Sequence, residues 1–397
     1  MSCAVGLNNN ATGLNLALSR DCERVVNFMQ RASALSGLQP AEGNPVLQAE
    51  GLYKIFSRDP AASIDMLKRG LSREEIRAQG GGVIGLEDVS FSVMPGEIFI
   101  IMGLSGSGKS TLIRCLNRLI EPTAGHIRID GQDVTAFNEA QLRDMRRRRM
   151  SMVFQSFGLL PHRTVLQNVK MGMTIRGDDA AACEEVARDA LAKVGLKAWA
   201  DHYPLTLSGG MRQRVGLARA LATKTDILLM DEPFSALDPL IRRELQDELL
   251  SLQAELKKTI IFVTHDIQEA VRIGSRIAIM REGRTVQIGT PQELITNPAD
   301  DYVRDFARDL DRGLVLRCGD VMRPLTPKEI GQNSSRSVPA SALLAGAYKQ
   351  LGMAEQVVVA GEHGEPVGML SAQAVLTALG TTITDRRSSR DEGKANG

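Results

Sequence analysis

A glycine-rich segment at residues 103–110 has the composition of a phosphate-binding loop. It reads Gly103-Leu104-Ser105-Gly106-Ser107-Gly108-Lys109-Ser110, followed by Thr111, and matches the pattern G-x-x-x-x-G-K-[ST]. The glycines allow backbone N–H groups to converge on phosphate oxygens, while Lys109 can reach the terminal phosphates and Ser110 can ligate Mg²⁺. The alternative is a glycine-rich turn with a chance lysine. An apolar run before the segment and a helical pattern after it favour the phosphate cradle.

Two carboxylates follow another apolar run, ILLM at 227–230. Because ligands of open α/β sheets bind at the carboxyl edge of the strands, Asp231 and Glu232 are expected at the same site as the loop. Asp231 fits the carboxylate that supports Mg²⁺ in phosphoryl transfer, and Glu232 is placed to orient or deprotonate an attacking water. An acidic turn after a buried strand is the alternative, which the upstream loop disfavours.

Polar residues also follow two further expected strands. His265 comes after the run IIFVT, and Gln155 comes after MSMVF. A histidine at a strand end can contact the γ-phosphate, although a lone histidine is more often structural. Gln155 can hydrogen-bond the attacking water or complete the Mg²⁺ shell.

A second helix start is rich in small residues. Ser208, Gly209 and Gly210 open an expected helix, where backbone N–H groups and the helix dipole favour an anion. The chain then has two phosphate-binding loops but one lysine-bearing cradle. A head-to-tail homodimer resolves this, with each ATP between the cradle of one chain and the serine-glycine loop of the other. An ordinary capped helix start is the alternative.

The elements around these residues alternate between strands and helices. This alternation predicts a largely parallel sheet with helices on both faces. Residues 156–207 lack strand patterning and predict a helical insert. Segments 46–56 and 125–134 predict strands of an antiparallel sheet beside the nucleotide site.

Three further segments allow more than one interpretation. The strand at 46–56 ends on Tyr53 and Phe56, and a ring there can stack on adenine or pack in the core. Residues 57–85 predict one or two short helices, with a solvated insertion as the default interpretation. The arginine run 146–149 lies in a helical stretch without interleaved aromatics, so a solvated helix face is favoured over nucleic-acid contact.

Composition narrows the class of protein. The 397 residues are 43% hydrophobic and carry a net charge of +1, so the chain can build about two or three domains and has no global attraction for nucleic acid. No apolar run reaches the roughly 18 residues that span a bilayer, and the start lacks a secretory signal pattern. We therefore expect an intracellular protein. Five scattered cysteines support neither a disulfide framework nor a zinc site.

The order of these motifs resembles the nucleotide-binding subunit of ATP-binding cassette (ABC) transporters. The segments that carry the resemblance are GLSGSGKST, Gln155, LSGGMRQR, ILLMDEP, SALD and His265. LSGGM discriminates this class, because other families with the same phosphate loop lack it. LYKIF with the insert after it, VFQSFGLLPHRTVLQNV and NPADDYVRDF extend the resemblance to ATPase subunits of glycine betaine/proline betaine (quaternary amine) importers, over about residues 46–312.

The resemblance implies ATP and Mg²⁺ as cofactors and a role for each site residue. The implied roles are adenine stacking for Phe56 rather than Tyr53; phosphate binding for Gly103, Ser105, Gly106, Ser107, Gly108, Lys109, Ser110 and Thr111; Mg²⁺ binding for Ser110, Gln155 and Asp231; and catalysis for Glu232 as base with His265 as switch and Gln155. Ser208, Gly209 and Gly210 would reach across the dimer, and Asp238 would close the D-loop of the nucleotide site.

The resemblance also implies the fold and the partners. The fold would be an α/β P-loop ABC ATPase with a RecA-like core, an antiparallel β subdomain and a helical subdomain at about 156–215. Residues 157–162 would dock a coupling helix of an integral membrane permease. The homodimer would then lie peripherally on the cytoplasmic face of the inner membrane and act with a periplasmic or extracellular substrate-binding protein only indirectly, without nucleic acid.

The implied function is ATP hydrolysis that energises import of glycine betaine, proline betaine or a related quaternary amine such as choline or carnitine. Two alternatives stay open on the residues: an importer ATPase for another small solute such as an amino acid, and a soluble ABC ATPase without a transport role. A regulatory module in which ATP turnover is secondary is a third.

Beyond about residue 312 the family pattern weakens. Residues 313–380 contain CGDVMRP and then a segment that reads helix, strand, turn, strand, helix, which resembles one CBS repeat, a small α+β unit. This repeat could pair with its copy across the dimer, or it could be a vestigial domain. The corresponding hypothesis is that this segment regulates the protein in response to ionic strength or a nucleotide. Residues 1–45 form an N-terminal extension and 381–397 a polar tail, both expected to be disordered at least in part.

Overall fold

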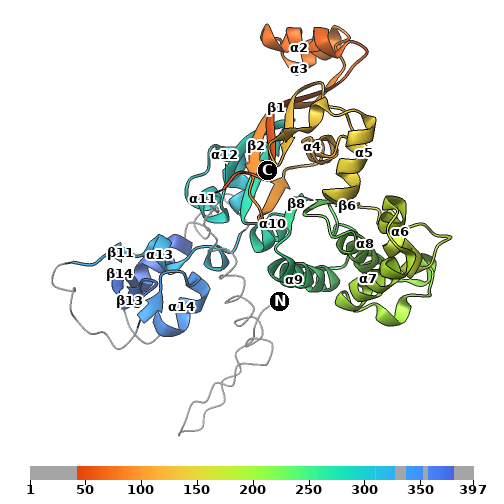
Figure 1. Cartoon of the computed structure of the whole chain (residues 1–397). Coiled ribbons are helices and arrows are strands. Elements are labelled where there is room, and N and C mark those ends of the chain that lie inside the picture. Colours follow the sequence, from red (N-terminus) through yellow and green to blue (C-terminus); the bar gives the residue numbers. More distant parts are fainter. Residues whose placement is uncertain (1–42, 309, 327–336, 352–355, 380–397) are drawn as a thin grey trace, which may run out of the picture.

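A computed structural model describes residues 43–308, 310–326, 337–351 and 356–379. Nearly all of the N-terminal extension and the whole of the polar tail lie outside these residues, as do Cys3 and Cys22. Three sheets organise the described chain, and Figure 1 shows the helices α6, α7 and α8 on one side of it and the C-terminal unit on another.

The central sheet has six strands in the order β10-β9-β3-β8-β7-β6, all parallel except the edge strand β10. The strands are β3 Ile98–Met102, β6 Met150–Val153, β7 Ile227–Asp231, β8 Thr259–Thr264, β9 Arg276–Arg281 and β10 Arg284–Gly289. The inner strands β3, β7 and β8 are buried along their whole length, as parallel strands covered on both faces must be. The predicted parallel sheet is confirmed.

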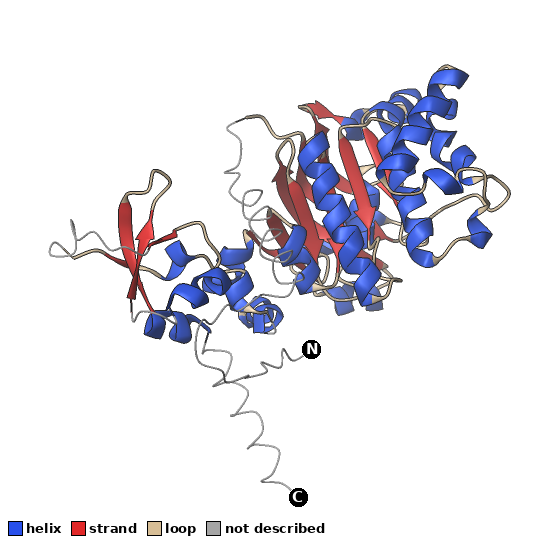
Figure 2. Ribbon diagram, turned by 90° about the horizontal axis from the view of Figure 1, so that it is seen from below, coloured by secondary structure: helices blue, strands red, loops and turns tan. Residues whose placement is uncertain are grey.

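Both faces of this sheet are covered (Figure 2). Alternate residues of β3 enter two hydrophobic clusters: Phe99 and Ile101 pack on the side of α4, while Ile100 and Met102 pack on the side of α8 and α9. The covering helices are α4 Lys109–Leu116, α5 Glu139–Arg148, α8 Gly209–Ala222, α9 Pro239–Leu256 and α10 Ile267–Ile273.

An antiparallel sheet in the order β2-β1-β4-β5 lies on the α4 side. Its strands are β1 Leu47–Phe56, β2 Val83–Val93, β4 Ala124–Ile129 and β5 Gln132–Asp133, followed by a 3₁₀ turn at Val134–Ala136. The strands predicted at 46–56 and 125–134 are confirmed. The helical insert is confirmed as well, as α6 Val165–Arg176 and α7 Ala180–Lys193 with 3₁₀ turns at Lys197–Trp199 and Pro204–Thr206.

The insert after β1 forms two helices as predicted, α2 Pro60–Lys68 and α3 Arg73–Ala78, but it is not simply a solvated insertion. Ile76 is fully buried and packs with Ile55 and Ile84 at the ends of β1 and β2. Burial of this side chain fixes α3 against the antiparallel sheet.

The arginine run is only partly a solvated face. Arg147 and Arg148 are exposed, as expected, on the last turn of α5. Arg146 instead donates one 2.8 Å hydrogen bond to the carbonyl of Asn117 at the end of α4, and Arg149 pairs with Asp226 at 2.7 Å. Arg146 thus ties α5 to the end of α4, while Arg149 ties the end of α5 to the residue before β7.

The C-terminal part contains a third sheet, in the order β11-β14-β13-β12. Its elements and the helices before it are α11 Pro291–Thr296, α12 Asp301–Arg308, a 3₁₀ turn Arg312–Leu314, α13 Cys318–Val321, β11 Arg323–Pro324, β12 Ser337–Pro339, α14 Leu344–Leu351, β13 Gln356–Ala360, β14 Pro366–Ser371 and a helix at 372–379. The predicted order of helix, strand, turn, strand and helix is confirmed. The CGDVMRP fragment belongs to the same unit, since β11 pairs with β14.

One hydrophobic cluster joins this unit to the part of the chain that contains the central sheet. Ile295 of α11 and Ala307 of α12 pack in it with Val315, Leu316 and residues of the third sheet. The boundary expected near residue 312 is therefore a packed junction.

No helix within the described ranges is both long and apolar enough to cross a membrane. Cys115, Cys183 and Cys318 are buried free thiols, and burial raises the pKa of Cys115 to about 12.

Candidate active site

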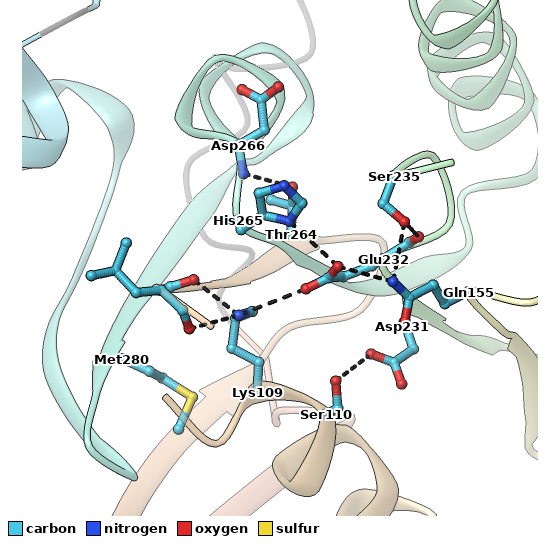
Figure 3. Close-up of polar contacts among 12 residues, drawn as sticks. Lys109, Ser110, Gln155, Asp231, Glu232, Ser235, Thr264, His265, Asp266 and Met280 are labelled. Carbon is cyan, nitrogen blue, oxygen red and sulfur yellow. Dashed lines mark hydrogen bonds and ion pairs between the residues drawn. The ribbon is translucent and has the colours of Figure 1, made fainter. Parts of the chain in front are cut away.

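The loop between β3 and α4 holds a buried lysine at its centre (Figure 3). The Lys109 ammonium donates hydrogen bonds to the carbonyls of Gly103 at 2.9 Å and Leu104 at 3.0 Å. Burial lowers the pKa of Lys109, and the charges of Glu232 and Asp231 oppose that effect. The side chain is thus held as a cation inside the loop, where a phosphate group would add further charge compensation.

The backbone of this loop has the geometry of an anion cradle. Gly106 and Gly108 adopt φ values of 80° and 100°, which side chains with a Cβ rarely tolerate. A Cβ on Gly108 would lie 2.6 Å from the Gly85 carbonyl, whereas one on Gly106 would meet only open space. Ser105 and Gly106 are exposed, and within the described chain the buried Ser107 hydroxyl has no hydrogen-bond partner. An open backbone beside an unsatisfied hydroxyl fits a bound phosphate group.

Asp231, at the end of β7, lies against the first turn of α4. Its Oδ1 accepts a 2.9 Å hydrogen bond from the Ser110 hydroxyl, and its Oδ2 lies 3.3 Å from the Arg114 guanidinium. The carboxylate is almost fully buried. Sequence reasoning missed Arg114, although its position one helical turn after Ser110 places both on one face of α4.

Three predicted site residues converge on Glu232 (Figure 3). The Lys109 ammonium lies 3.7 Å from Oε1, while the Gln155 amide and the His265 ring nitrogen Nδ1 each lie 3.4 Å from Oε2. Glu232 has a φ of 45° and donates its N–H to the carbonyl of Val263 on β8 at 3.1 Å. This left-handed turn directs the residue to the edge where β7 and β8 end.

Gln155 lies on the Glu232 side of the site. Besides Glu232, its amide donates to the Ser235 hydroxyl at 3.3 Å, and Ser235 in turn donates to the Glu232 carbonyl at 3.0 Å. Ser235 was not singled out from the sequence, because a lone serine four residues after the end of β7 does not by itself indicate a role at the site. These contacts suit the predicted contact with an attacking water.

Ser208 and Asp238 begin α8 and α9 as helix caps. The Ser208 hydroxyl accepts from the N–H of Met211 at 3.3 Å, and Asp238 accepts from the N–H of Ile241 at 3.1 Å. A Cβ on Gly210 would lie 2.6 Å from the Ile241 side chain. In the described residues, these contacts join the two helix starts to each other and do not include the Lys109 loop.

Phe56 lies closer to the phosphate loop than its place in the sequence suggests. Its ring is half exposed, and a Cβ on Gly85 would be 2.8 Å from its Cε2 atom. The carbonyl of Gly85 in turn lies against Gly108 of the loop. Tyr53 is half-buried within β1, opposite Ala124 of β4. The placement favours Phe56 over Tyr53 as the ring that a base would meet.

The side chains at this edge fit Mg²⁺ only together with a nucleotide. Within the described residues, no group of three or more His, Cys, Asp or Glu side chains could hold a metal ion. Ser110 and Asp231 offer one hydroxyl and one carboxylate. Mg²⁺ in proteins is commonly bound by one or two carboxylates plus substrate phosphates and water, so this pair is adequate when phosphate oxygens are present.

Comparison with known proteins identifies the family. The ABC transporter family matches residues 86–235. The glycine betaine/proline betaine transport system ATP-binding protein ProV of Escherichia coli K12 is 54% identical over 297 residues, which cover 75% of this chain and 74% of ProV. The chain belongs to the ProV-like ATP-binding subunits of ABC importers. It is therefore an ABC transporter ATPase, and the resemblance noted in the sequence is confirmed.

Two further relatives of this ProV-like subunit bear on its assembly and its extent. The glycine betaine/carnitine transport ATP-binding protein GbuA of Listeria monocytogenes is 48% identical, with 85% of this chain and 83% of GbuA covered. The ATP-binding cassette MJ0796, solved as a dimer in a post-hydrolysis state with ADP and phosphate, is 30% identical with a TM-score of 0.53, covering 62% of this chain and 98% of that one. Cassettes of this fold thus form dimers.

Proposed function

We propose that this ProV-like ATPase hydrolyses ATP at the edge formed by β3, β7 and β8 and uses the energy to import a quaternary amine. The convergence of Lys109, Gln155 and His265 on Glu232, beside the Ser110–Asp231 pair, is the observation that carries the proposal. A cationic cradle, a carboxylate pair and a polar strand end are the parts that phosphoryl transfer to water requires.

Each side chain of this site has a task in the proposed reaction. Lys109 and the backbone N–H groups of residues 103–111 bind the β- and γ-phosphates, and Phe56 stacks on the adenine ring. Glu232 accepts a proton from the attacking water, while Gln155 and His265 hold that water and the γ-phosphate in place. Ser110, Asp231 and Gln155 would hold Mg²⁺ together with the nucleotide, and the ion would neutralise charge at the phosphates.

The working unit of this proposal is a homodimer. The start of α8 offers the backbone N–H groups of Ser208, Gly209 and Gly210. This helix has 14 residues, and its dipole favours an anion at that end. Asp238 begins α9 beside the same loop. Two chains arranged head to tail bring this loop to the phosphate cradle of the partner, and separation of the chains after hydrolysis resets the transporter.

The energy is delivered to an integral membrane permease. The segment 157–162 follows Gln155 directly, and Arg219 of α8 donates to the carbonyl of Phe157 at 3.0 Å. A permease helix seated on this segment senses the γ-phosphate site through Gln155. The subunit then works on the cytoplasmic face of the membrane, and an external substrate-binding protein contacts only the permease.

Glycine betaine is the first solute to test, with proline betaine, carnitine and choline as related candidates. ProV is named for glycine betaine and proline betaine, and GbuA for glycine betaine and carnitine. We further propose that residues 313–380 are a CBS-like regulatory unit of this importer, supported by the four-stranded sheet packed against α11 and α12.

Uptake of labelled glycine betaine tests the substrate. Cells that carry the chain with its permease should accumulate the label, cells without the chain should not, and an excess of each unlabelled amine ranks the alternatives. Competition by an amino acid but by none of the quaternary amines would reject the substrate class and leave the ATPase intact.

A further inference from the structure

The insert helix α3 contributes a charge to a buried cluster behind the phosphate loop. Glu87 of β2 is buried, yet two arginines pair with it. Arg73, the first residue of α3, donates to its Oε2 at 2.8 Å from Nη2 and 3.2 Å from Nε, and Arg284 of β10 pairs with its Oε1. Burial alone would raise the pKa of Glu87, but these two arginines hold it below its usual value.

The backbone of Glu87 is linked to the phosphate loop through one glycine. The N–H of Glu87 donates to the carbonyl of Gly283 at 2.9 Å, and the N–H of Gly283 donates to the carbonyl of Ser107 at 2.9 Å. Gly283 forms the turn between β9 and β10, with a φ of 73°. The insert, the β2 strand and the phosphate loop are therefore joined by consecutive short contacts.

Arg73 also holds the strand segment that touches both the loop and the base-stacking ring. Its Nη1 donates to the carbonyl of Ile84 at 3.1 Å, one residue before Gly85. The Gly85 carbonyl lies against Gly108, and a Cβ on Gly85 would lie 2.8 Å from the Cε2 atom of Phe56. Movement of this segment would shift the phosphate cradle and the ring together.

We propose that Arg73 is a positioning residue for the nucleotide site, through which the α2–α3 insert sets the relation between the phosphate loop and the adenine-stacking ring. The inference rests on the nucleotide site proposed above and assigns the insert a part in it. Arg73 lies outside the phosphate loop. It acts on the loop and on the ring through Glu87, Gly283 and Gly85.

Local sequence fixes Arg73 in this place. Ser72 and Glu75 form a reciprocal capping box, which sets the start of α3 one residue before the arginine. Ile76, three residues later, is buried and anchors the helix. The planar guanidinium then bridges a carboxylate and a backbone carbonyl at once, a geometry that a lysine ammonium does not reproduce.

Nucleotide affinity and turnover of the purified full-length chain test this inference. Arg73→Ala should raise the KM for ATP and the Kd for ADP by about 10-fold, with kcat within about 2-fold of wild type, because ground-state placement is disturbed and the catalytic carboxylate is not. For Arg73→Lys, the KM for ATP and the Kd for ADP should lie between those of wild type and Arg73→Ala. Arg77→Ala is the matched control, since Arg77 is exposed on the same helix, and it should leave both constants unchanged.

A substitution at Glu87 provides a second test of the inference if Arg73→Ala fails to fold. Glu87→Gln keeps the shape but removes the charge that both arginines share, so it should raise KM as Arg73→Ala does, and the double variant should add little. An unchanged KM in folded Arg73→Ala and Arg73→Lys, or fully additive effects, would overturn the inference. Lys109→Ala distinguishes failure of the Arg73 inference from failure of the proposed nucleotide site. If Lys109→Ala also leaves nucleotide affinity unchanged, the proposed nucleotide site itself is wrong.

Discussion

The Nδ1 atom of His265 lies 3.4 Å from the Oε2 atom of Glu232, across the ends of the neighbouring parallel strands β8 and β7. The imidazole is more than half exposed, whereas the carboxylate is largely covered. An exposed imidazole thus lies beside a largely covered carboxylate at the edge where the phosphate loop ends. Under the proposed function, this pair lies where the attacking water would be activated.

Replacing the carboxylate of this pair should separate binding from hydrolysis. Glu232→Gln keeps the shape and the contacts to Gln155 and His265 but removes the proton acceptor, so hydrolysis should fall by about 100-fold or more. ATP binding should persist, and ATP should hold the variant as a closed dimer. Phosphate release and size-exclusion chromatography with ATP measure the two effects, with the exposed Glu185→Gln as control. Wild-type turnover in Glu232→Gln would remove the base assignment.

The buried carboxylate beside α4 should govern the metal requirement. Asp231→Asn removes the charge that faces Ser110 and Arg114, so we expect the Mg²⁺ concentration for half-maximal hydrolysis to rise by about 10–100-fold. Titration of ATPase activity with Mg²⁺ at saturating ATP measures this. An unchanged midpoint, with lower activity at every concentration, would show that Asp231 acts on something other than the metal.

Two loop glycines should differ in their tolerance of a methyl group. Gly108→Ala places a Cβ 2.6 Å from the Gly85 carbonyl, while Gly106→Ala points into open space, and both have positive φ. Gly106→Ala should therefore cost only the backbone term of about 1–2 kcal/mol, and Gly108→Ala clearly more. Urea unfolding without nucleotide gives both free energies of unfolding. Equal losses would contradict the close packing of Gly85 on the loop.

Glu269 should give the protein a measurable pH dependence of stability. It is buried on α10, and burial raises its pKa against hydrogen bonds from Thr264 and Gln246, while the charge of Asp266 raises it further. The folded state thus holds this proton more tightly than the unfolded chain, so its contribution to stability falls as pH rises above the ordinary pKa of 4.5.

Glu269→Gln removes the titrating carboxyl and with it this pH-dependent contribution to the free energy of unfolding. The free energy of unfolding of the variant, measured against wild type in urea, should therefore improve steadily as pH is raised from about 4.5 toward neutrality. A difference between the two proteins that does not change with pH would show that folding does not raise the pKa of this carboxyl.

The convergence at Glu232 could be predicted from sequence because it needs little long-range information. Gln155, Glu232 and His265 each follow a strand, and parallel strands of one sheet end at the same edge. The phosphate loop adds its own fixed order of strand, loop and helix. The phosphate-loop motif and the parallel direction of the strands are therefore enough to predict that these side chains lie close together.

The partners that sequence reasoning missed depend on contacts between distant segments. Arg73 reaches Glu87 and Ile84 only because β1 and β2 pair and carry α3 with them, and no local pattern encodes that pairing. β11 joins β14 across more than forty residues in the same way. Such contacts follow from sheet register, which a single sequence does not reveal.

The central claim is that ATP hydrolysis by this chain drives uptake of a quaternary amine. Wild-type chain and Glu232→Gln, each reconstituted in liposomes with the permease and its substrate-binding protein, should be compared for phosphate release and uptake of labelled glycine betaine in one experiment. We predict that both signals appear with the wild type and that both disappear with Glu232→Gln. Uptake that continues in the variant while phosphate release stops would contradict the account.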